Sequence, residues 1–179
     1  MSDTTQLSQY LTFAVAGEEY AIPILRVREI LEYSRLTRVP STPSYIRGVI
    51  NLRGSVVPVI DLAVKFGFAE SAITRTTCIV VVEIGTPGET TIMGVIADSV
   101  RQVVELGQEA IEESPSFGVH GRVDFLLGMG IVDGAFVLLL DIDRVLSSTE
   151  IFAAIEAGSP APDPPRAEGD AVPAPGSAP

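Results

Sequence analysis

The sequence predicts a mainly β protein built from two related β subdomains that pack on each other. Three observations lead to this fold class. Short alternating apolar segments recur between turn signals, helical periodicity is confined to short stretches, and one part of the chain resembles another. Such strands are typical of small barrels or a sandwich, and the pattern leaves both open. Hydrophobic residues make up 46 % of the chain, which is enough to build a sizeable core.

The predicted strands come in pairs, and each pair flanks a turn signal as in a β-hairpin. In chain order the pairs are 10–15 with 20–22, 49–52 with 56–60, 78–84 with 90–96, and 128–132 with 135–140. The intervening turns are predicted at 17–19, 53–54, 85–88 and 133–134. Two helices are predicted, a short one over 61–66 that ends at Gly67 and a longer C-terminal one over 141–157.

A weak internal repeat supports the division into two subdomains. Residues 48–62 resemble 128–142, and residues 20–31 resemble 93–104 in the same order. In the first match the paired positions are Gly48 with Gly128, Gly54 with Gly134, Val57 with Val137, and Asp61 with Asp141. We therefore expect a folded region over 9–157, divided into subdomains of about 9–70 and 71–157. Each has too few strands for a large core of its own, so the two should pack together.

The two ends of the chain differ from this folded region. Residues 158–179 are rich in Pro, Ala, Gly and Ser, and this composition predicts a disordered tail because it buries little apolar surface. Residues 1–8 are also expected to be disordered. The N-terminus lacks the basic and apolar regions of a signal peptide, and no apolar stretch reaches the roughly 18 residues that a membrane span needs. A cytoplasmic protein is expected.

The sequence contains no arrangement of residues that favours catalysis or metal binding. Asp61 and Asp141 each stand between a strand and a helical stretch, and are therefore predicted to cap helices rather than to form a catalytic pair. His120 is the only histidine and has no Cys or His neighbour with which to bind a metal. Cys78 lies in an apolar run and is predicted to be a buried strand thiol. A non-enzymatic protein without a cofactor or metal is favoured.

Charge is unevenly distributed along the chain. The formal net charge of −11 argues against nucleic acid and against an anionic membrane surface as partners. Residues 26–65 nevertheless hold seven of the twelve Lys and Arg and only three acidic residues, which gives this segment a charge of +4. The segment is either a solvated face or a contact face for an acidic partner. Within it Arg53, at a predicted hairpin tip, is a candidate contact residue.

Several segments resemble the CheW-like domain family. The resemblance is carried by the run from Glu18 to Ile30, by Thr-Arg-Val-Pro at 37–40, by the run from Pro43 to Gly54, and by Val-Val-Pro-Val-Ile-Asp-Leu at 56–62. It continues more loosely through 94–100 and from Phe125 to about residue 150. The resemblance therefore covers most of the chain and leaves out the tail.

The resemblance implies two SH3-like five-stranded β-barrels and an adaptor that couples chemoreceptors to the histidine kinase CheA in signalling arrays. The implied partners are the cytoplasmic tip of the receptors, the regulatory domain of the kinase, and other CheW-like domains in rings. The implied receptor-binding residues are Ile24, Glu29, Ile30 and Arg53. The implied kinase-binding residues are Val27, Arg47, Gly48 and Phe117. The implied location is the cytoplasm, at membrane-associated arrays.

Three alternatives remain beside this interpretation. Within the family, the chain could be a paralogous adaptor of another receptor–kinase array, such as one governing twitching or gliding motility. An enzyme built on an SH3-like barrel would need catalytic groups, and none is recognised in the sequence. A small-ligand sensor would show a ligand-dependent melting temperature.

Overall fold

The computed structural model describes residues 7–86, 89–112, 125–146 and 151, and in this part the chain is mainly β-structure, as predicted. The strands are β1 (Leu7–Val15), β2 (Glu18–Pro23), β3 (Val27–Glu32), β4 (Ile46–Leu52), β5 (Ser55–Asp61), β6 (Cys78–Thr86), β7 (Glu89–Ala97), β8 (Ser99–Gly107), β9 (Leu126–Val132) and β10 (Ala135–Leu140). The helical segments are η1 (Ile24–Arg26), α1 (Leu62–Lys65), η2 (Gln108–Ala110) and α2 (Ile142–Val145).

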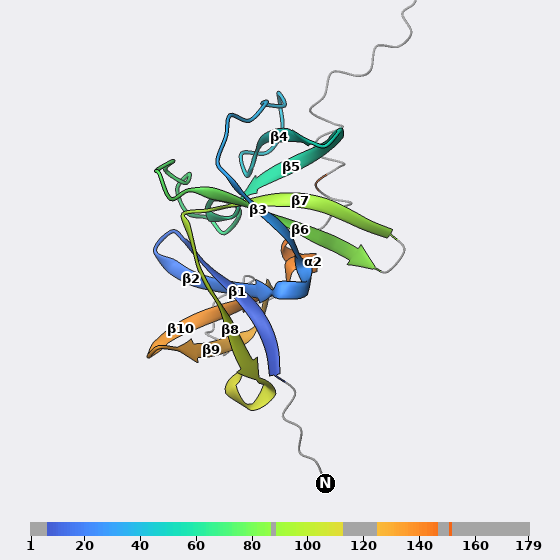
Figure 1. The fold of residues 1–179 in the computed structure, drawn as a ribbon. Coiled ribbons are helices and arrows are strands. Elements are labelled where there is room, and N and C mark those ends of the chain that lie inside the picture. Colours follow the sequence, from blue (N-terminus) through green and yellow to red (C-terminus); the bar gives the residue numbers. More distant parts are fainter. Residues whose placement is uncertain (1–6, 87–88, 113–124, 147–150, 152–179) are drawn as a thin grey trace, which may run out of the picture.

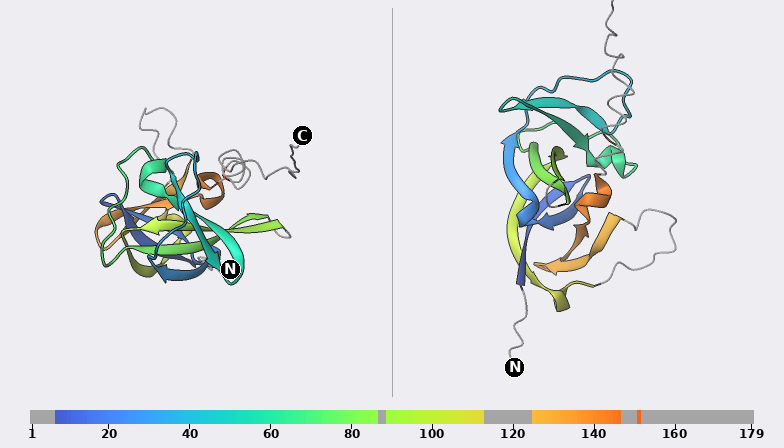
Figure 2. Two further views of the ribbon diagram at one scale, coloured as in Figure 1. Left: turned by 90° about the horizontal axis from the view of Figure 1, so that it is seen from above. Right: turned by 90° about the vertical axis from the view of Figure 1, so that its right-hand side faces the viewer.

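The strands form two five-stranded sheets, one above the other in Figure 1 and in the right-hand view of Figure 2. Sheet A has the strand order β8-β1-β2-β10-β9, and sheet B has the order β3-β6-β7-β5-β4. One parallel pair occurs in each sheet, β2 with β10 in sheet A and β5 with β7 in sheet B. The other neighbours are antiparallel. Two five-stranded sheets agree with the predicted fold class.

The two sheets do not follow the expected boundary near residue 70. Strands β1 and β2 lie in sheet A, whereas β3, β4 and β5, which follow them in the chain, lie in sheet B. Strands β6 and β7 then stay in sheet B, and β8, β9 and β10 return to sheet A. The chain thus crosses between sheets after the second strand of each repeat. Local periodicity could not reveal this exchange, because it does not show which sheet a strand joins.

The duplication itself is visible in the register of the parallel pairs. Val59 of β5 lies opposite Gly94 of β7, and Leu139 of β10 lies opposite Ala21 of β2. These two pairs are related by the same offsets that relate the repeated segments, 80 residues from Val59 to Leu139 and 73 from Ala21 to Gly94. Positions that match in sequence therefore occupy matching places in the two sheets.

Three hairpins close through two-residue turns whose residues both have positive φ. The turns are Ala16-Gly17 (φ 52° and 84°), Arg53-Gly54 (51° and 88°) and Asp133-Gly134 (52° and 80°). Turns of this hand match the twist of the flanking strands. The first lies earlier than predicted, because the left-handed backbone falls on Ala16 and Gly17, and Glu18 and Glu19 already belong to β2. In the fourth hairpin, residues 87–88 lie outside the described residues.

The main core lies between the sheets and is shared by them. Phe13 and Ile22 of sheet A belong to the same cluster as Val80 and Val95 of sheet B, and all four are fully buried. Burying one such side chain contributes about 1.5–3 kcal/mol, and truncating Phe13 to alanine would cost about 3–5 kcal/mol. The two sheets therefore pack on each other around one core.

The predicted termini are only partly described. Leu7 and Ser8 were expected in a disordered N-terminus, but they lie in β1 opposite Gly107 and Leu106 of β8. Of the helix predicted over 141–157, the described part contains α2 and the helical, buried Ile151. The tail over 158–179 lies outside the described residues, as do Phe117 and His120.

Cys78 begins β6 and is buried, as predicted. Burial raises the pKa of its thiol, since the thiolate is poorly solvated there. The group is therefore protonated near neutral pH and unsuited to nucleophilic chemistry.

Candidate interaction surface

The candidate surface begins at the turn between β4 and β5. The left-handed backbone of Arg53 and Gly54 reverses the chain within two residues. The backbone N–H of Gly54 donates a hydrogen bond to Oδ1 of Asn51, with 2.9 Å between the nitrogen and the oxygen. This contact fixes the turn and leaves the Arg53 side chain 74 % exposed, as the sequence predicted for a hairpin tip.

Arg53 forms a two-pronged ion pair with Glu29 of β3. Nη1 of Arg53 donates to Oε1 at 2.6 Å, and Nη2 donates to Oε2 at 3.3 Å. The hydrogen bond from Arg53 lowers the pKa of the Glu29 carboxyl, and the same bond raises the pKa of Arg53. Since β3 and β4 are the opposite edges of sheet B, the pair links a hairpin tip to the far edge of the sheet. This link is in keeping with the closed shape of a small barrel.

Exposed apolar side chains accompany the ion pair. Ile30, the residue after Glu29, is 45 % exposed and by strand alternation points to the other face of β3, and Val56, just beyond the turn, is 67 % exposed. We call Glu29, Ile30 and Arg53 the coupling face. Exposed charges beside apolar side chains are typical of contact surfaces. Ile24 differs from these three residues because it is half-buried and packs against the shared core.

Sequence reasoning missed two exposed apolar residues. Leu25 is 90 % exposed in η1, and Val56 follows the β4–β5 turn. For Val56 the sequence did contain a signal of exposure, because the residue follows closely on the predicted turn at 53–54. For Leu25 no signal separates it from a core leucine, because within η1 the neighbouring Ile24 packs against the core while Leu25 faces solvent.

Arg47, which the family resemblance assigns to kinase binding, is mostly buried. Its side chain is 11 % exposed, and its Nη1 lies 2.7 Å from Oδ2 of Asp61, which is fully buried. Asp61 also accepts hydrogen bonds from the backbone of Ala63 and from both the backbone and the hydroxyl of Ser71. A buried carboxylate with this many donors is well compensated, so Arg47 helps to stabilise the fold.

Asp61 and Asp141 both cap helices, as predicted. The Asp61 side chain accepts from the backbone N–H of Ala63 in α1, and the Asp141 side chain accepts from the N–H of Arg144 in α2. Each carboxylate therefore stabilises the start of a helix, and that of Asp61 also binds Arg47 and Ser71.

Gly48 has a structural role that the sequence did not reveal. Its φ is +152°, and a Cβ placed on it would lie 2.6 Å from the carbonyl oxygen of Thr37. The segment before β4 therefore approaches so closely that only glycine fits. Val27, the third predicted kinase residue, is half-buried and packs on the shared core. Phe117 lies outside the described residues.

The described residues offer no site for a metal. In this part of the chain no three His, Cys, Asp or Glu side chains come together in a way that could hold a metal ion. Within the same residues, no helix is both long and apolar enough to cross a membrane.

Comparisons with known proteins agree with this architecture. A model of the CheW-like domain matches residues 9–150. The chain belongs to the CheW-like family. It is 38 % identical to the chemotaxis protein CheW of Klebsiella aerogenes over 143 residues, which cover 80 % of this chain and 84 % of the relative. It is 30 % identical to the protein FrzA of Myxococcus xanthus over 142 residues, 78 % of this chain and 86 % of the relative.

A solved CheW structure has the same fold. The crystal structure of the scaffolding protein TtCheW from Thermoanaerobacter tengcongensis matches with a TM-score of 0.70 and 28 % identity. The match covers 82 % of this chain and 92 % of the solved chain. The two chains therefore share their fold over most of their length.

Proposed function

We propose that this chain is a non-enzymatic adaptor that couples chemoreceptors to the histidine kinase CheA. The observation that carries the proposal is the exposed ion pair of the coupling face, where Glu29 of β3 holds Arg53 at a hairpin tip. An exposed ion pair contributes little to folding, so its placement at a hairpin tip favours a role in binding. Because Glu29 already orients the guanidinium, less ordering is needed when a partner binds.

The proposed partner of the coupling face is the cytoplasmic tip of the receptors, with Ile24, Glu29, Ile30 and Arg53 as contacts. The proposed kinase contacts are Val27, Arg47, Gly48 and Phe117. Because Arg47 and Gly48 also hold the fold together, their substitution would affect stability as well as binding. In this proposal the adaptor works in the cytoplasm, at membrane-associated arrays, where it also joins other CheW-like domains in rings.

The test uses the purified full-length chain with receptor-containing membranes and the kinase from the same organism. Arg53→Glu should lower co-sedimentation with the membranes and kinase activation by about tenfold or more, because it reverses a charge at the contact. Arg75→Glu makes the same change at another exposed arginine and should leave both unchanged. The thermal midpoints of both variants should stay close to that of the wild type. Full activation by Arg53→Glu would contradict the proposal.

A second candidate is an adaptor of a different receptor–kinase array, such as one governing twitching or gliding motility. The similarity to FrzA, a relative that is not named CheW, supports this second candidate. The two candidates differ in the partners rather than in the surface. Mass spectrometry of the receptor and kinase that co-purify with the wild-type chain, but not with Arg53→Glu, distinguishes them.

A further inference from the structure

An aromatic pocket lies where α1 meets sheet A. It has a volume of about 180 Å³ and is lined chiefly by Tyr20, Phe66, Phe68, Phe125, Leu138 and Leu140. The ring centroids of Tyr20 and Phe66 are 5.4 Å apart, and those of Phe66 and Phe125 are 6.1 Å apart, so the rings form a continuous wall. Phe68 is 48 % exposed. The lining residues do not include those of the coupling face, so a ligand in the aromatic pocket leaves that face free.

An exposed apolar strip continues the pocket along the outer face of β10. Val137 and Leu139 are buried in sheet A, so the alternate residues Phe136 and Leu138 lie on the opposite face of the strand. Phe136 is 60 % exposed and is paired with Ile131 of β9, which is 55 % exposed. Adjoining exposed apolar side chains of this kind are typical of a binding site.

A carboxylate lies next to the aromatic pocket. Glu18 is exposed and precedes Tyr20 by two residues in β2, so the two side chains lie on the same face of the strand. Burial and the nearby charge of Glu18 both raise the pKa of Tyr20. Within the part of the chain that the structure describes, Glu18 forms no ion pair. The site therefore combines aromatic rings with an anionic side chain that can accept a cation.

The C-terminal tail of this chain has the matching composition. Residues 160–166 read Pro-Ala-Pro-Asp-Pro-Pro-Arg, and Arg166 is the only Lys or Arg after Arg144. Proline-rich segments favour the extended polyproline II helix and bind aromatic-lined surfaces at a low cost of ordering. Such a segment needs no core of its own. Pro164 and Arg166 are about 6 Å apart along a polyproline II helix, and Tyr20 and Glu18 are about 7 Å apart along β2.

The tail is long enough to reach the pocket. Ile151 is fully buried in the same cluster as Tyr20 and Leu140, which both line the pocket. Pro162 follows Ile151 by eleven residues, which corresponds to about 35 Å of extended chain and exceeds the diameter of a small domain. Because the tail is tethered to the domain, its effective concentration at the pocket is high, and weak intrinsic affinity is sufficient for docking.

We propose that residues 162–166 of the tail dock in the aromatic pocket of the same molecule, with Pro164 and Pro165 against Phe68 and Phe125. Arg166 then lies beside Glu18, and this ion pair sets the direction of the segment. Docking removes exposed apolar surface at the pocket from water. The proposed coupling function assigns no role to the pocket or the tail, so the inference goes beyond it and needs neither receptor nor kinase for its test.

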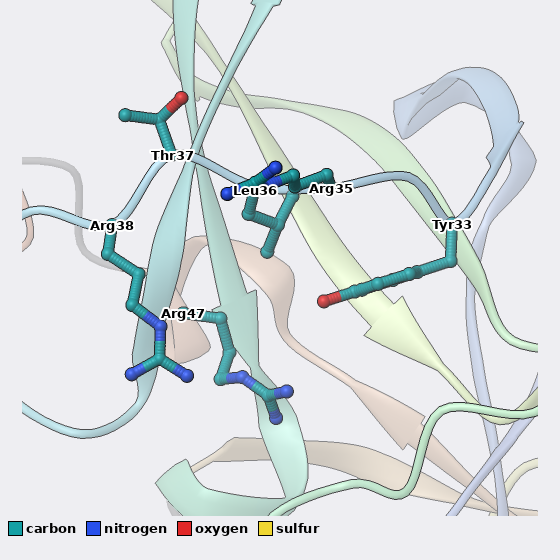
Figure 3. A pocket seen from close by; sticks show the side chains of 6 residues that line it. All are labelled: Tyr33, Arg35, Leu36, Thr37, Arg38 and Arg47. Atoms are coloured by element: carbon teal, nitrogen blue, oxygen red, sulfur yellow. The ribbon is translucent and has the colours of Figure 1, made fainter.

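A competing place for the tail is the hollow beside β4. Figure 3 shows arginine side chains along it, those of Arg35, Arg38 and Arg47. This hollow would attract the acidic residues of the tail, which are Asp163, Glu168 and Asp170. The two places thus select different features of the tail, because the aromatic pocket selects the prolines and Arg166, whereas the hollow selects carboxylates. A measurement of where the tail lies distinguishes them.

The experiment attaches a nitroxide to the full-length chain at Ala167→Cys and compares methyl NMR signals before and after reduction of the label. Cys78 is buried, so the label reacts at residue 167. The signals of Leu138 and Leu140 should lose most of their intensity while the nitroxide is present. Those of Leu36, beside β4, and of Ile30, on the coupling face, should keep theirs.

Paired variants of the labelled chain test the contacts. Pro164→Ala/Pro165→Ala should restore most of the lost intensity, whereas Pro173→Ala/Pro175→Ala removes two prolines elsewhere in the tail and should leave the loss unchanged. Glu18→Gln should reduce the loss, and Glu19→Gln, on the other face of β2, should not. The thermal midpoints of these variants should be alike, since the exchanges avoid the core.

Three results would overturn the proposal. The first is full intensity at Leu138 and Leu140, or a loss that the two proline variants change equally. The second is a loss at Leu36 in place of Leu138, which would assign the tail to the hollow beside β4. The third is an equal loss when nitroxide-labelled chains are mixed with isotope-labelled chains that carry no nitroxide, which would show that the tail docks on a second copy.

Discussion

Sheets A and B share a backbone plan but differ in their charged side chains. Gly48 of sheet B and Gly128 of sheet A are equivalent, and a Cβ on either would lie 2.6 Å from a carbonyl oxygen, that of Thr37 or of Glu112. The backbone N–H of Asp61 donates to residue 45, and that of Asp141 donates to the equivalent residue 125. The duplication has therefore kept the contacts that set the path of the chain.

The equivalent turns differ in charge. In sheet B, Arg53 pairs with Glu29, while in sheet A the same two places are occupied by Asp133 and Gln102, whose side chains lie 3.4 Å apart. The neighbouring apolar positions are exposed in both sheets, with Ile30 at 45 % and its counterpart Val103 at 47 %. Shape and exposure are thus alike, and charge is what distinguishes the coupling face from its counterpart. A partner that binds through an ion pair with the arginine at this turn would therefore bind sheet B and not sheet A.

The largest expected difference between the sheets concerns their capping aspartates. Asp61→Ala should lower the free energy of unfolding by about 3–5 kcal/mol, because it removes the buried partner of the mostly buried Arg47 and leaves only the exposed Glu70, 3.7 Å away. Asp141→Ala should cost about 1 kcal/mol, since its carboxylate is partly exposed and only a cap is lost. Urea unfolding of the two variants measures both values.

A double variant tests the reason for this difference. Position 47 of sheet B corresponds to Leu127 in sheet A. Arg47→Leu combined with Asp61→Ala removes the unpaired charge and should recover part of the stability lost in Asp61→Ala alone. No recovery would show that Arg47 is not the source of the larger cost.

The scaffold glycines should behave alike in the two sheets. Gly48→Ala and Gly128→Ala should each destabilise by about 3 kcal/mol, because both would place a Cβ against a carbonyl oxygen. Gly54→Ala is the control. A Cβ on Gly54 would have no atom within 4 Å, so this substitution should cost only the strain of a positive φ, about 1–2 kcal/mol. A mild effect at Gly48 together with a severe one at Gly54 would mean that backbone angle, not the close approach, decides.

The smallest expected effect is the titration of Glu29, followed by NMR. The hydrogen bond from Arg53 lowers its pKa, so the pair contributes above the ordinary glutamate pKa and is lost as the pH falls through the lowered value. In Arg53→Gln the pKa of Glu29 should rise toward its ordinary range. Sheet A has no counterpart to this titration, since Gln102 does not ionise. An unchanged pKa in Arg53→Gln would mean that the pair does not form in solution.

The hairpins and the two aspartate caps could be predicted from the sequence because each depends on neighbouring residues, although the first turn lies at Ala16-Gly17 and not at 17–19. The repeat could be predicted because equivalent segments still share residues at a constant offset. The exposure of Arg53 followed from its turn in the same way. The buried Arg47 could not be predicted, since its partner Asp61 lies on the next strand and an arginine in a strand is usually exposed. The exchange of β3 and β8 between sheets and the approach of Thr37 to Gly48 depend on tertiary packing, which local patterns do not contain.

The most direct test of the account is a comparison of Arg53→Glu with Asp133→Arg in kinase activation on receptor-containing membranes. Both variants reverse a charge at the same exposed position of equivalent turns, and both should fold like the wild type. We expect Arg53→Glu to lose activation and Asp133→Arg to retain it, because the coupling face lies on sheet B. Equal losses, or a greater loss in Asp133→Arg, would contradict this assignment.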